Sequence, residues 1–201
     1  MISIEEALSK LKENFQSSLV IHQKTSWLGM KAQKCPNDAW VYQELIYKLK
    51  PDFIIETGTA FGGGTLFLST ICEAIGHGTI ITIENDKDRY SSVILNNSNI
   101  YRIFGSSVDN EVINKVKEII DGNTVLVILD SDHSYEHVMK ELESYKQFIK
   151  SGFYIIVEDT HMKETNRAVD DFIRNNKEFI IDKECEKYIF TFNPGGFLVK
   201  I

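Results

Sequence analysis

Residues 53–85, FIIETGTAFGGGTLFLSTICEAIGHGTIITIEN, decide the fold of this chain. The apolar run Phe53–Thr57 predicts a strand, the glycine-rich segment after it predicts a tight turn, and a helical pattern covers about residues 64–75. A second strand is predicted from Thr79 to Glu84. A strand, a glycine loop, a helix and a strand in this order are typical of a βαβ unit, in which the helix connects two parallel strands.

The rest of the chain continues this alternation. Further strands are predicted at Asn99–Phe104, Thr124–Asp130, Phe153–Val157 and Phe179–Asp182, and further helices at about 86–97, 108–121, 134–150 and 164–176. Near the end, a Pro-Gly-Gly turn separates Tyr188–Phe192 from Phe197–Ile201, which predicts a terminal hairpin. We therefore expect an α/β fold with a doubly wound, mostly parallel sheet and an antiparallel C-terminal hairpin strand.

The first fifty residues are expected to form a helical arm or lid in front of this fold. An amphipathic helix is indicated by four apolar residues at helical spacing, Ile4, Leu8, Leu11 and Phe15. A second helix is predicted from Asp38 to Lys50, where Pro51 ends it. Residues 1–50 are thus interpreted as an arm packed on the core, and residues 51–201 as one folding unit.

The composition argues against several classes of binding partner. The formal net charge is −7, and the chain has no run of five or more basic residues, so nonspecific attraction to nucleic acid or to anionic lipid is not expected. No window approaches 18 uninterrupted apolar residues. The three cysteines Cys35, Cys72 and Cys185 fit neither a disulfide framework nor a zinc spacing. We expect a cytoplasmic protein that binds neither nucleic acid nor a membrane.

The glycine-rich segment is the first candidate binding site. Small residues after a strand let a ligand approach the backbone, and the start of the next helix offers free N–H groups. The spacing is not that of dinucleotide-binding proteins, because Ala60 stands where the second glycine would be, and it is not a P-loop. The alternative is a glycine-rich turn kept for helix–sheet packing, with Glu84 as a solvated strand end.

The segment resembles the acidic-x-Gly-x-Gly-x-Gly motif of class I methyltransferases, which cradles the methionine moiety of S-adenosylmethionine (SAM). The resemblance assigns cofactor binding to Glu56, Gly58, Thr59, Ala60, Gly62 and Gly63. Glu84 ends the next strand, where a carboxylate can accept both ribose hydroxyls. By the same resemblance Ser106, in the pair Ser106-Ser107, approaches the adenine; the alternative is that this pair caps the next helix.

Two acidic segments follow the fourth and fifth predicted strands. Their carboxylates are Asp130, Asp132, Glu158 and Asp159. Adjacent parallel strands lie about 4.8 Å apart, and both segments would open onto the same end of the sheet. Carboxylates gathered there would repel one another, and a bound Mg²⁺, with Mn²⁺ or Ca²⁺ as alternatives, would keep them ionised. The alternative is that some of them, including Asp132 and Asp159, only cap helices.

His133 is the candidate general base. It lies three residues after Asp130, and its unperturbed pKa near neutrality suits proton transfer from a substrate hydroxyl. The alternative is a histidine at the start of a helix that faces water.

The combination of segments resembles a narrower family, that of cephalosporin hydroxylases and rhamnosyl O-methyltransferases. The matching pieces include Lys50–Thr59, Leu129–Ser134, Gly152–Thr160 and Pro194–Gly196. The resemblance implies a Rossmann-like, seven-stranded sheet with helices on both faces and a SAM-dependent methyltransferase.

The resemblance also implies a site for Mg²⁺ (or Mn²⁺). Carried over to this chain, the metal ligands are Glu158, Asp159 and either Asp130 or Asp132, and the choice between the two aspartates stays open. Asp130 is also counted among the cofactor-binding residues, and Asp132 with His133 among the catalytic ones. The analogy with metal-dependent catechol-type methyltransferases supports His133 as the base.

The predicted activity is O-methylation of a hydroxyl on a sugar, a glycan or a small natural product. A homo-oligomer is compatible with the resemblance. Two alternatives from other classes are a non-catalytic relative that only binds the nucleoside, and an iron- or 2-oxoglutarate-dependent hydroxylase, in which His133, His161 and Asp130 would hold the iron.

Overall fold

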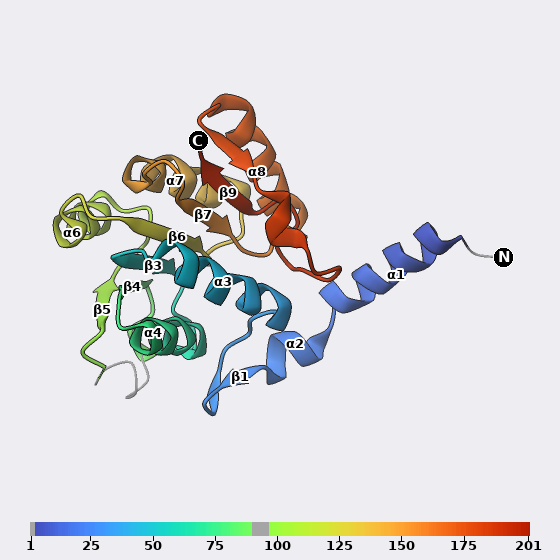
Figure 1. The fold of residues 1–201 in the computed structure, drawn as a ribbon, viewed down its shortest axis with the longest axis horizontal. Coiled ribbons are helices and arrows are strands. Elements are labelled where there is room, and N and C mark those ends of the chain that lie inside the picture. Colours follow the sequence, from blue (N-terminus) through green and yellow to red (C-terminus); the bar gives the residue numbers. More distant parts are fainter. Residues whose placement is uncertain (1–2, 90–96) are drawn as a thin grey trace.

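The computed structural model describes residues 3–89 and 97–201, and its centre is a seven-stranded sheet in the order β5-β4-β3-β6-β7-β9-β8 (Figure 1). The strands are β3 (Phe53–Thr57), β4 (Thr79–Glu84), β5 (Ile100–Phe104), β6 (Val125–Leu129), β7 (Tyr154–Val157), β8 (Phe179–Ile181) and β9 (Phe197–Lys200). The pairs among β3 to β7 are parallel, whereas β9 runs antiparallel to both β7 and β8. The predicted mostly parallel sheet with an antiparallel C-terminal strand is confirmed.

Helices cover both faces of the sheet, because alternate residues of each strand point to opposite sides. They are α3 (Pro36–Leu49), α4 (Gly63–Ile75), α6 (Asn110–Ile120), α7 (Tyr135–Tyr145) and α8 (Lys163–Asn175). Ile55 and Val127 belong to the apolar cluster that includes α6, α7 and α8, whereas Ile54 and Leu126 belong to the cluster with α3 and α4. All four side chains are fully buried, as continuous apolar strands predict.

The N-terminal residues before α3 form the least buried part of the described chain. They comprise α1 (Ile4–Gln16), α2 (Leu19–Lys24) and a short hairpin of β1 (Ser26–Trp27) and β2 (Met30–Lys31). Helix α1 buries none of its residues and projects from the body of the molecule, which it contacts at its end through Phe15 (Figure 1). The next helix, α3, is integrated in the core, where Ile46 is fully buried. A domain boundary at residue 50 stays a prediction.

One predicted strand is wrong. Residues 188–192 form no strand; β9 pairs instead with β8, which lies earlier in the chain. The reason is that the backbone of this segment is bonded to side chains of α3: Asn37 donates to the Phe190 carbonyl, and Asp38 accepts from the Phe192 N–H. These groups are therefore not available for a ladder with β9.

Two predicted helices differ in extent. The helix predicted at 134–150 ends as an α-helix at Tyr145 and continues as a 3₁₀ turn, Lys146–Phe148. Of the helix predicted at 86–97, the described part contains a 3₁₀ turn at Lys87–Arg89, and residues 90–96 lie outside the described chain. Within residues 3–89 and 97–201, no helix is long and apolar enough to cross a membrane.

The sheet and the glycine loop meet at Gly58. A Cβ atom there would lie 2.0 Å from the backbone oxygen of Asp130, and the residue has a φ of +84°. Gly76 also has a positive φ, of +68°, but it ends α4 in open space, where an added Cβ would meet no atom within 4 Å. Substitution of Gly76 therefore tests backbone strain alone, whereas substitution of Gly58 tests the same strain together with a steric clash.

We predict that Gly58→Ala destabilises the protein far more than Gly76→Ala. The second substitution costs about 1 kcal/mol, the strain of a left-handed residue, whereas the first adds a clash with the backbone after β6. Urea unfolding of both variants measures the difference. Equal losses of unfolding free energy in the two variants would contradict the close approach of Gly58 to the backbone of Asp130.

Candidate functional site

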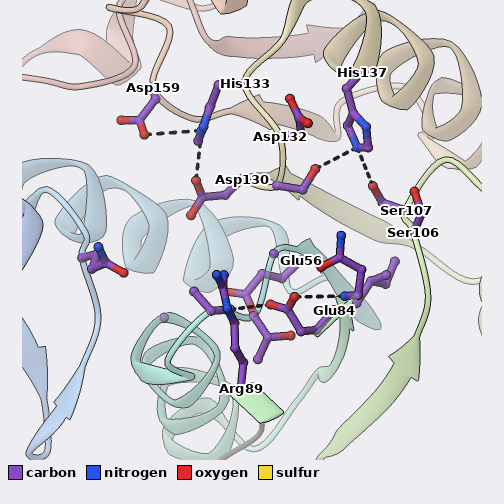
Figure 2. Close-up of a pocket in the computed structure, with 18 of the residues that line it drawn as sticks. Glu56, Glu84, Arg89, Ser106, Ser107, Asp130, Asp132, His133, His137 and Asp159 are labelled. Atoms are coloured by element: carbon purple, nitrogen blue, oxygen red, sulfur yellow. Dashed lines mark hydrogen bonds and ion pairs between the residues drawn. The ribbon is translucent and has the colours of Figure 1, made fainter. Parts of the chain in front are cut away.

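A cavity of about 650 Å³ opens where the parallel strands end (Figure 2). It is lined by the loop after β3, by the ends of β4 and β5, by the segment after β6 and by residues 32–34 of the N-terminal segment. In open α/β sheets ligands bind outside the carboxyl ends of the strands, so this is the expected place for a site.

The glycine loop forms one wall of the cavity. The residues of the loop that line it are Gly58, Thr59, Ala60 and Gly64. Gly62 and Gly63 do not line it: Gly62 starts α4 at a φ of +82°, and a Cβ on Gly63 would lie 2.4 Å from the carbonyl oxygen of Lys31. These two glycines therefore shape the turn and let the N-terminal segment pack against the helix.

Glu56, the acid before the loop, is buried at the base of the cavity. Its Oε2 accepts hydrogen bonds from the hydroxyls of Thr65 at 2.5 Å and Thr82 at 2.8 Å. Burial raises the pKa of Glu56 above its ordinary value, although the Lys34 charge and both hydroxyls oppose this. Hydroxyl groups from β4 and α4 thus hold the carboxylate in one position.

Glu84 links the end of β4 to the glycine loop. Its Oε2 accepts from the N–H of Ala60 at 2.9 Å, and its Oε1 accepts from the N–H groups of Asn85 and Asp86, each at 3.0 Å. The residue is 5% exposed, so it is not a solvated strand end. A carboxylate offers about four acceptor positions, and these three bonds leave capacity for a ligand hydroxyl.

The serine pair after β5 borders the same cavity. Ser106 and Ser107 both line it, and the N-cap residue of α6 is Asp109. The alternative that the pair caps this helix is therefore not what the structure shows.

A histidine to which the sequence assigned no role joins the serine pair. His137 Nε2 lies 3.0 Å from the hydroxyl of Ser107 and 3.1 Å from that of Ser131, which in turn donates to buried Glu141 at 2.7 Å (Figure 2). Contact with Glu141 raises the pKa of His137. This network fixes polar groups on the wall opposite the glycine loop.

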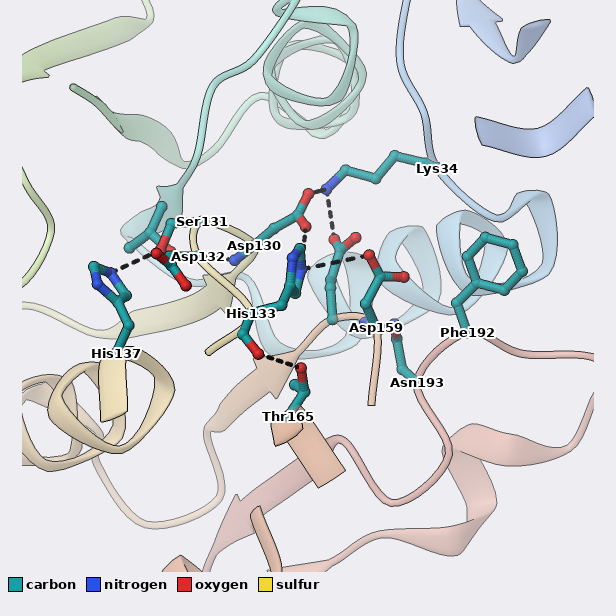
Figure 3. Close-up of polar contacts among 12 residues, drawn as sticks. Lys34, Asp130, Ser131, Asp132, His133, His137, Asp159, Thr165, Phe192 and Asn193 are labelled. Carbon is teal, nitrogen blue, oxygen red and sulfur yellow. Dashed lines mark hydrogen bonds and ion pairs between the residues drawn. The ribbon is translucent and has the colours of Figure 1, made fainter. Parts of the chain in front are cut away.

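The two acidic segments converge beyond the glycine loop (Figure 3). Asp130 follows β6, and Asp159 follows β7. His133 Nε2 lies 3.4 Å from Asp130 Oδ1 and 3.4 Å from Asp159 Oδ2, and one ligand atom from each of the three residues lies within 4.8 Å of the other two. The His133 nitrogen is buried and makes no hydrogen bond to any residue that the structure describes.

Lys34 completes the cluster, and sequence reasoning missed it. Its Nζ donates to Asp130 Oδ2 at 2.5 Å and to Glu158 Oε1 at 2.6 Å (Figure 3). Burial alone would lower the pKa of Lys34, but Asp130, Glu158 and Glu56 raise it, so the ammonium stays charged. A single lysine 96 positions before Asp130 carries no motif that would mark it in the sequence.

The cluster holds three carboxylates, those of Asp130, Glu158 and Asp159, against one permanently charged cation, Lys34. Burial and the neighbouring Asp130 raise the pKa of Glu158 to about 8, and the same two causes raise the pKa of Asp159. Burial alone would lower the pKa of His133, but Asp130, Asp159 and Glu158 raise it to about 9. Buried oxygen donors whose ionisation is this unfavourable fit a hard divalent cation such as Mg²⁺.

Asp132 lies apart from the other acids. Its Oδ1 accepts from the N–H of Ser134 at 2.8 Å, and this bond lowers the pKa of Asp132. It lines the cavity, but it is not among the residues whose ligand atoms converge with Asp130. Of the two aspartates left open by the sequence, the geometry favours Asp130 as a metal ligand.

The backbone conformation of Asp159 sets the direction of its carboxylate. The residue has a φ of +55°, a left-handed conformation that costs energy for an L-residue. Its N–H donates to Asn193 Oδ1 at 2.9 Å, and Asn193 Nδ2 donates to the Tyr42 hydroxyl at 2.7 Å. His161, a further sequence candidate, lies 3.6 Å from Asp159 Oδ1 and packs on the ring of Phe192.

Comparison with known proteins decides the family. The sequence model of the family "Rhamnosyl O-methyltransferase/CmcI" matches residues 20–201. The chain belongs to this family. The resemblance seen in the sequence is thereby confirmed.

Curated relatives share the match over most of their length. A rhamnosyl O-methyltransferase of Mycobacterium tuberculosis is 28% identical over 198 residues, which cover 90% of this chain and 80% of the relative. The rhamnosyl O-methyltransferase of Mycobacterium leprae is 26% identical over 191 residues, which cover 88% and 83%.

Solved structures show the same fold. A structure of CmcI with Mg and SAM is 18% identical and superposes with a TM-score of 0.72, over 88% of this chain and 76% of CmcI. The O-methyltransferase NovP is 17% identical, with a TM-score of 0.57 over 82% of this chain and 77% of NovP.

Proposed function

We propose that this family member is a SAM- and Mg²⁺-dependent O-methyltransferase that acts on a hydroxyl of a sugar, a glycan or a small natural product. The observation that carries the proposal is that a glycine loop, a backbone-anchored acid and the half-buried cluster of Asp130, His133 and Asp159 border one cavity. A fold alone does not define chemistry, whereas these three features supply cofactor recognition and a place for a cation.

In this proposal the cofactor lies along the ends of β3, β4 and β5. The loop residues Gly58–Ala60 take the methionine moiety, Glu84 accepts from a ribose hydroxyl, and Ser106 borders the adenine. Support comes from their shared cavity and from the remaining acceptor capacity of Glu84. Asp130 lines the same cavity, so the cofactor's methionine end and the acid cluster would share a wall.

Asp130, Glu158 and Asp159 are the proposed ligands for Mg²⁺, with Mn²⁺ as a substitute. A divalent cation bound there would lower the pKa of an acceptor hydroxyl and orient it. The three side chains offer only oxygen donors, and Asn193 and Tyr42 hold the conformation of the last of them. We do not include Asp132, whose carboxylate is bonded to the start of α7.

His133 is proposed to accept the proton of the acceptor hydroxyl. Its Nε2 lies 3.4 Å from Asp130 Oδ1 and 3.4 Å from Asp159 Oδ2, so it would lie next to an acceptor hydroxyl bound to a cation on these acids. The surrounding acids raise its pKa to about 9, so it acts as a base only where additional positive charge offsets them.

A carbohydrate or another small molecule is the proposed acceptor, because the curated relatives are named rhamnosyl O-methyltransferases. Phe61, within the glycine-rich segment, has an exposed ring, and Lys31 Nζ lies 4.2 Å from the centroid of this ring. The pair offers an apolar surface next to a positive charge. Self-association and a cytoplasmic location stay predictions.

Neither alternative gains support from the geometry. An iron hydroxylase would use two histidines and one carboxylate, whereas the converging residues among those described are two aspartates and one histidine. A non-catalytic nucleoside binder would have no use for a buried set of acids at the methionine end of the cavity.

We predict that Glu84→Gln weakens SAM binding by roughly tenfold or more, because one carboxylate oxygen becomes an NH₂ group, which cannot accept from a ribose hydroxyl or from the backbone N–H groups that anchor Glu84. Isothermal titration calorimetry measures the affinity. The matched control is Glu111→Gln, at an exposed residue of α6 that pairs with Lys115. Wild-type protein that binds no SAM, or a variant that binds it as tightly, would contradict the proposed cofactor site.

We also predict that His133→Ala lowers kcat for methyl transfer by roughly 10²- to 10⁴-fold and leaves SAM affinity within about twofold of wild type. The assay follows transfer of a labelled methyl group from SAM to rhamnosides in the presence of Mg²⁺. His77→Ala is the control, since His77 pairs with Asp52 at the opposite end of the strands. Full turnover by His133→Ala would exclude the histidine as the base.

A further inference from the structure

Lys34 is the only part of the candidate site that comes from the N-terminal segment and reaches the acid cluster within the described residues. Its ammonium bridges one oxygen of Asp130 and one of Glu158, at 2.5 and 2.6 Å, and its side chain is 11% exposed. The other Asp130 oxygen faces His133.

We propose that the Lys34 ammonium occupies the place of the divalent cation between Asp130 and Glu158, so that metal binding displaces the ammonium from these two acids. The inference rests on the metal site of the proposed function. It makes Lys34 a positioning residue, which acts on the reaction through the metal ligands.

The donor atoms that Lys34 contacts are the ones that an ion would need. Metal ions take carboxylate oxygens at about 2.0–2.6 Å, which leaves no room for a lysine nitrogen at hydrogen-bond distance from the same two oxygens on the same side. An ion held by both Asp130 and Glu158 therefore competes with Lys34 for space as well as for charge. While Lys34 stays in place, the converging ligand atoms that it leaves to an ion are those of Asp130, His133 and Asp159 among the described residues.

Lys34 also belongs to the wall of the cofactor cavity. Ala32, Gln33 and Lys34 line the cavity together with the glycine loop. A Cβ on Gly64 would lie 2.8 Å from Lys34 Cε, so the lysine stem packs directly against the start of α4. Displacement of the ammonium therefore changes a wall that the proposed cofactor would touch.

The backbone of this segment is held by contacts on either side. Gln33 has a φ of +54°, which L-residues rarely adopt. Gly63, on α4, has the backbone of Lys31 and Ala32 so close that a Cβ would lie 2.4 and 2.7 Å from their nearest atoms. When the two ion pairs of Lys34 are broken, its contacts with the acid cluster are lost while the packing on α4 remains.

The test is the affinity for Mn²⁺, measured by electron paramagnetic resonance on the full chain. Lys34→Met is expected to bind Mn²⁺ roughly tenfold tighter than wild type or better, because the competing ammonium is gone. Lys31→Met is the matched control: it removes the same charge from the same segment, but Lys31 lies over Phe61 rather than on the acids. Its affinity should stay within about twofold of wild type.

A second measurement uses the unchanged chain and does not depend on the folding of a variant. Amine acylation followed by mass spectrometry should modify Lys34 slowly without metal and at least several times faster in saturating Mn²⁺. Lys31 serves as the internal comparator, with a rate that Mn²⁺ leaves unchanged.

The outcomes separate the lysine from the metal site. If wild type binds Mn²⁺ while Lys34→Met binds no more tightly and Lys34 stays protected, displacement is excluded and the proposed metal site stands. If Lys34→Met binds Mn²⁺ and wild type does not, the ammonium blocks the site and the ion does not displace it, so displacement is excluded. If neither protein binds Mn²⁺, the metal site and the role of Lys34 both fall.

Discussion

The burial of several carboxylates at the ends of two neighbouring strands is the constraint on which the site depends. Asp130 follows β6, and Glu158 and Asp159 follow β7, so the parallel pairing of these strands brings the acids together. Ionised carboxylates at this depth require positive charge, and the described chain supplies Lys34 and, when protonated, His133 and His161 in contact with them. A divalent cation would complete the balance, which links the fold directly to the proposed chemistry.

The packing of the glycine loop against the segment after β6 explains why the cofactor would lie beside the acids. Gly58 passes so close to the backbone of Asp130 that no side chain fits between them. The glycine loop and the segment after β6 are thereby held side by side, and Glu84 ties the loop to the next strand. Positioning of two reactants in one cavity is a large part of what a methyltransferase must provide, because transfer needs no covalent enzyme intermediate.

Much of this was readable in the sequence. Strands β6 and β7 are continuous apolar runs, and the acidic motifs follow them immediately, so the order of the strands predicts which residues meet at the edge of the sheet. The terminal hairpin was predicted with the wrong partner for β9, because local pattern cannot show that Asp38 of α3 captures the backbone of Phe192. Lys34 and His137 were missed as site residues for a similar reason. Neither belongs to a recognisable motif, and each reaches the site through contacts with residues distant in sequence, Asp130 for Lys34 and Ser107 for His137.

A crystal structure with S-adenosylhomocysteine and Mn²⁺, in which anomalous scattering locates the ion, tests the proposed site most directly. We expect the nucleoside along the ends of β3, β4 and β5, and the ion between Asp130, Glu158 and Asp159. A nucleoside bound elsewhere, or an ion absent from these three carboxylates at saturating Mn²⁺, would contradict the proposal that this cavity carries out metal-dependent methyl transfer.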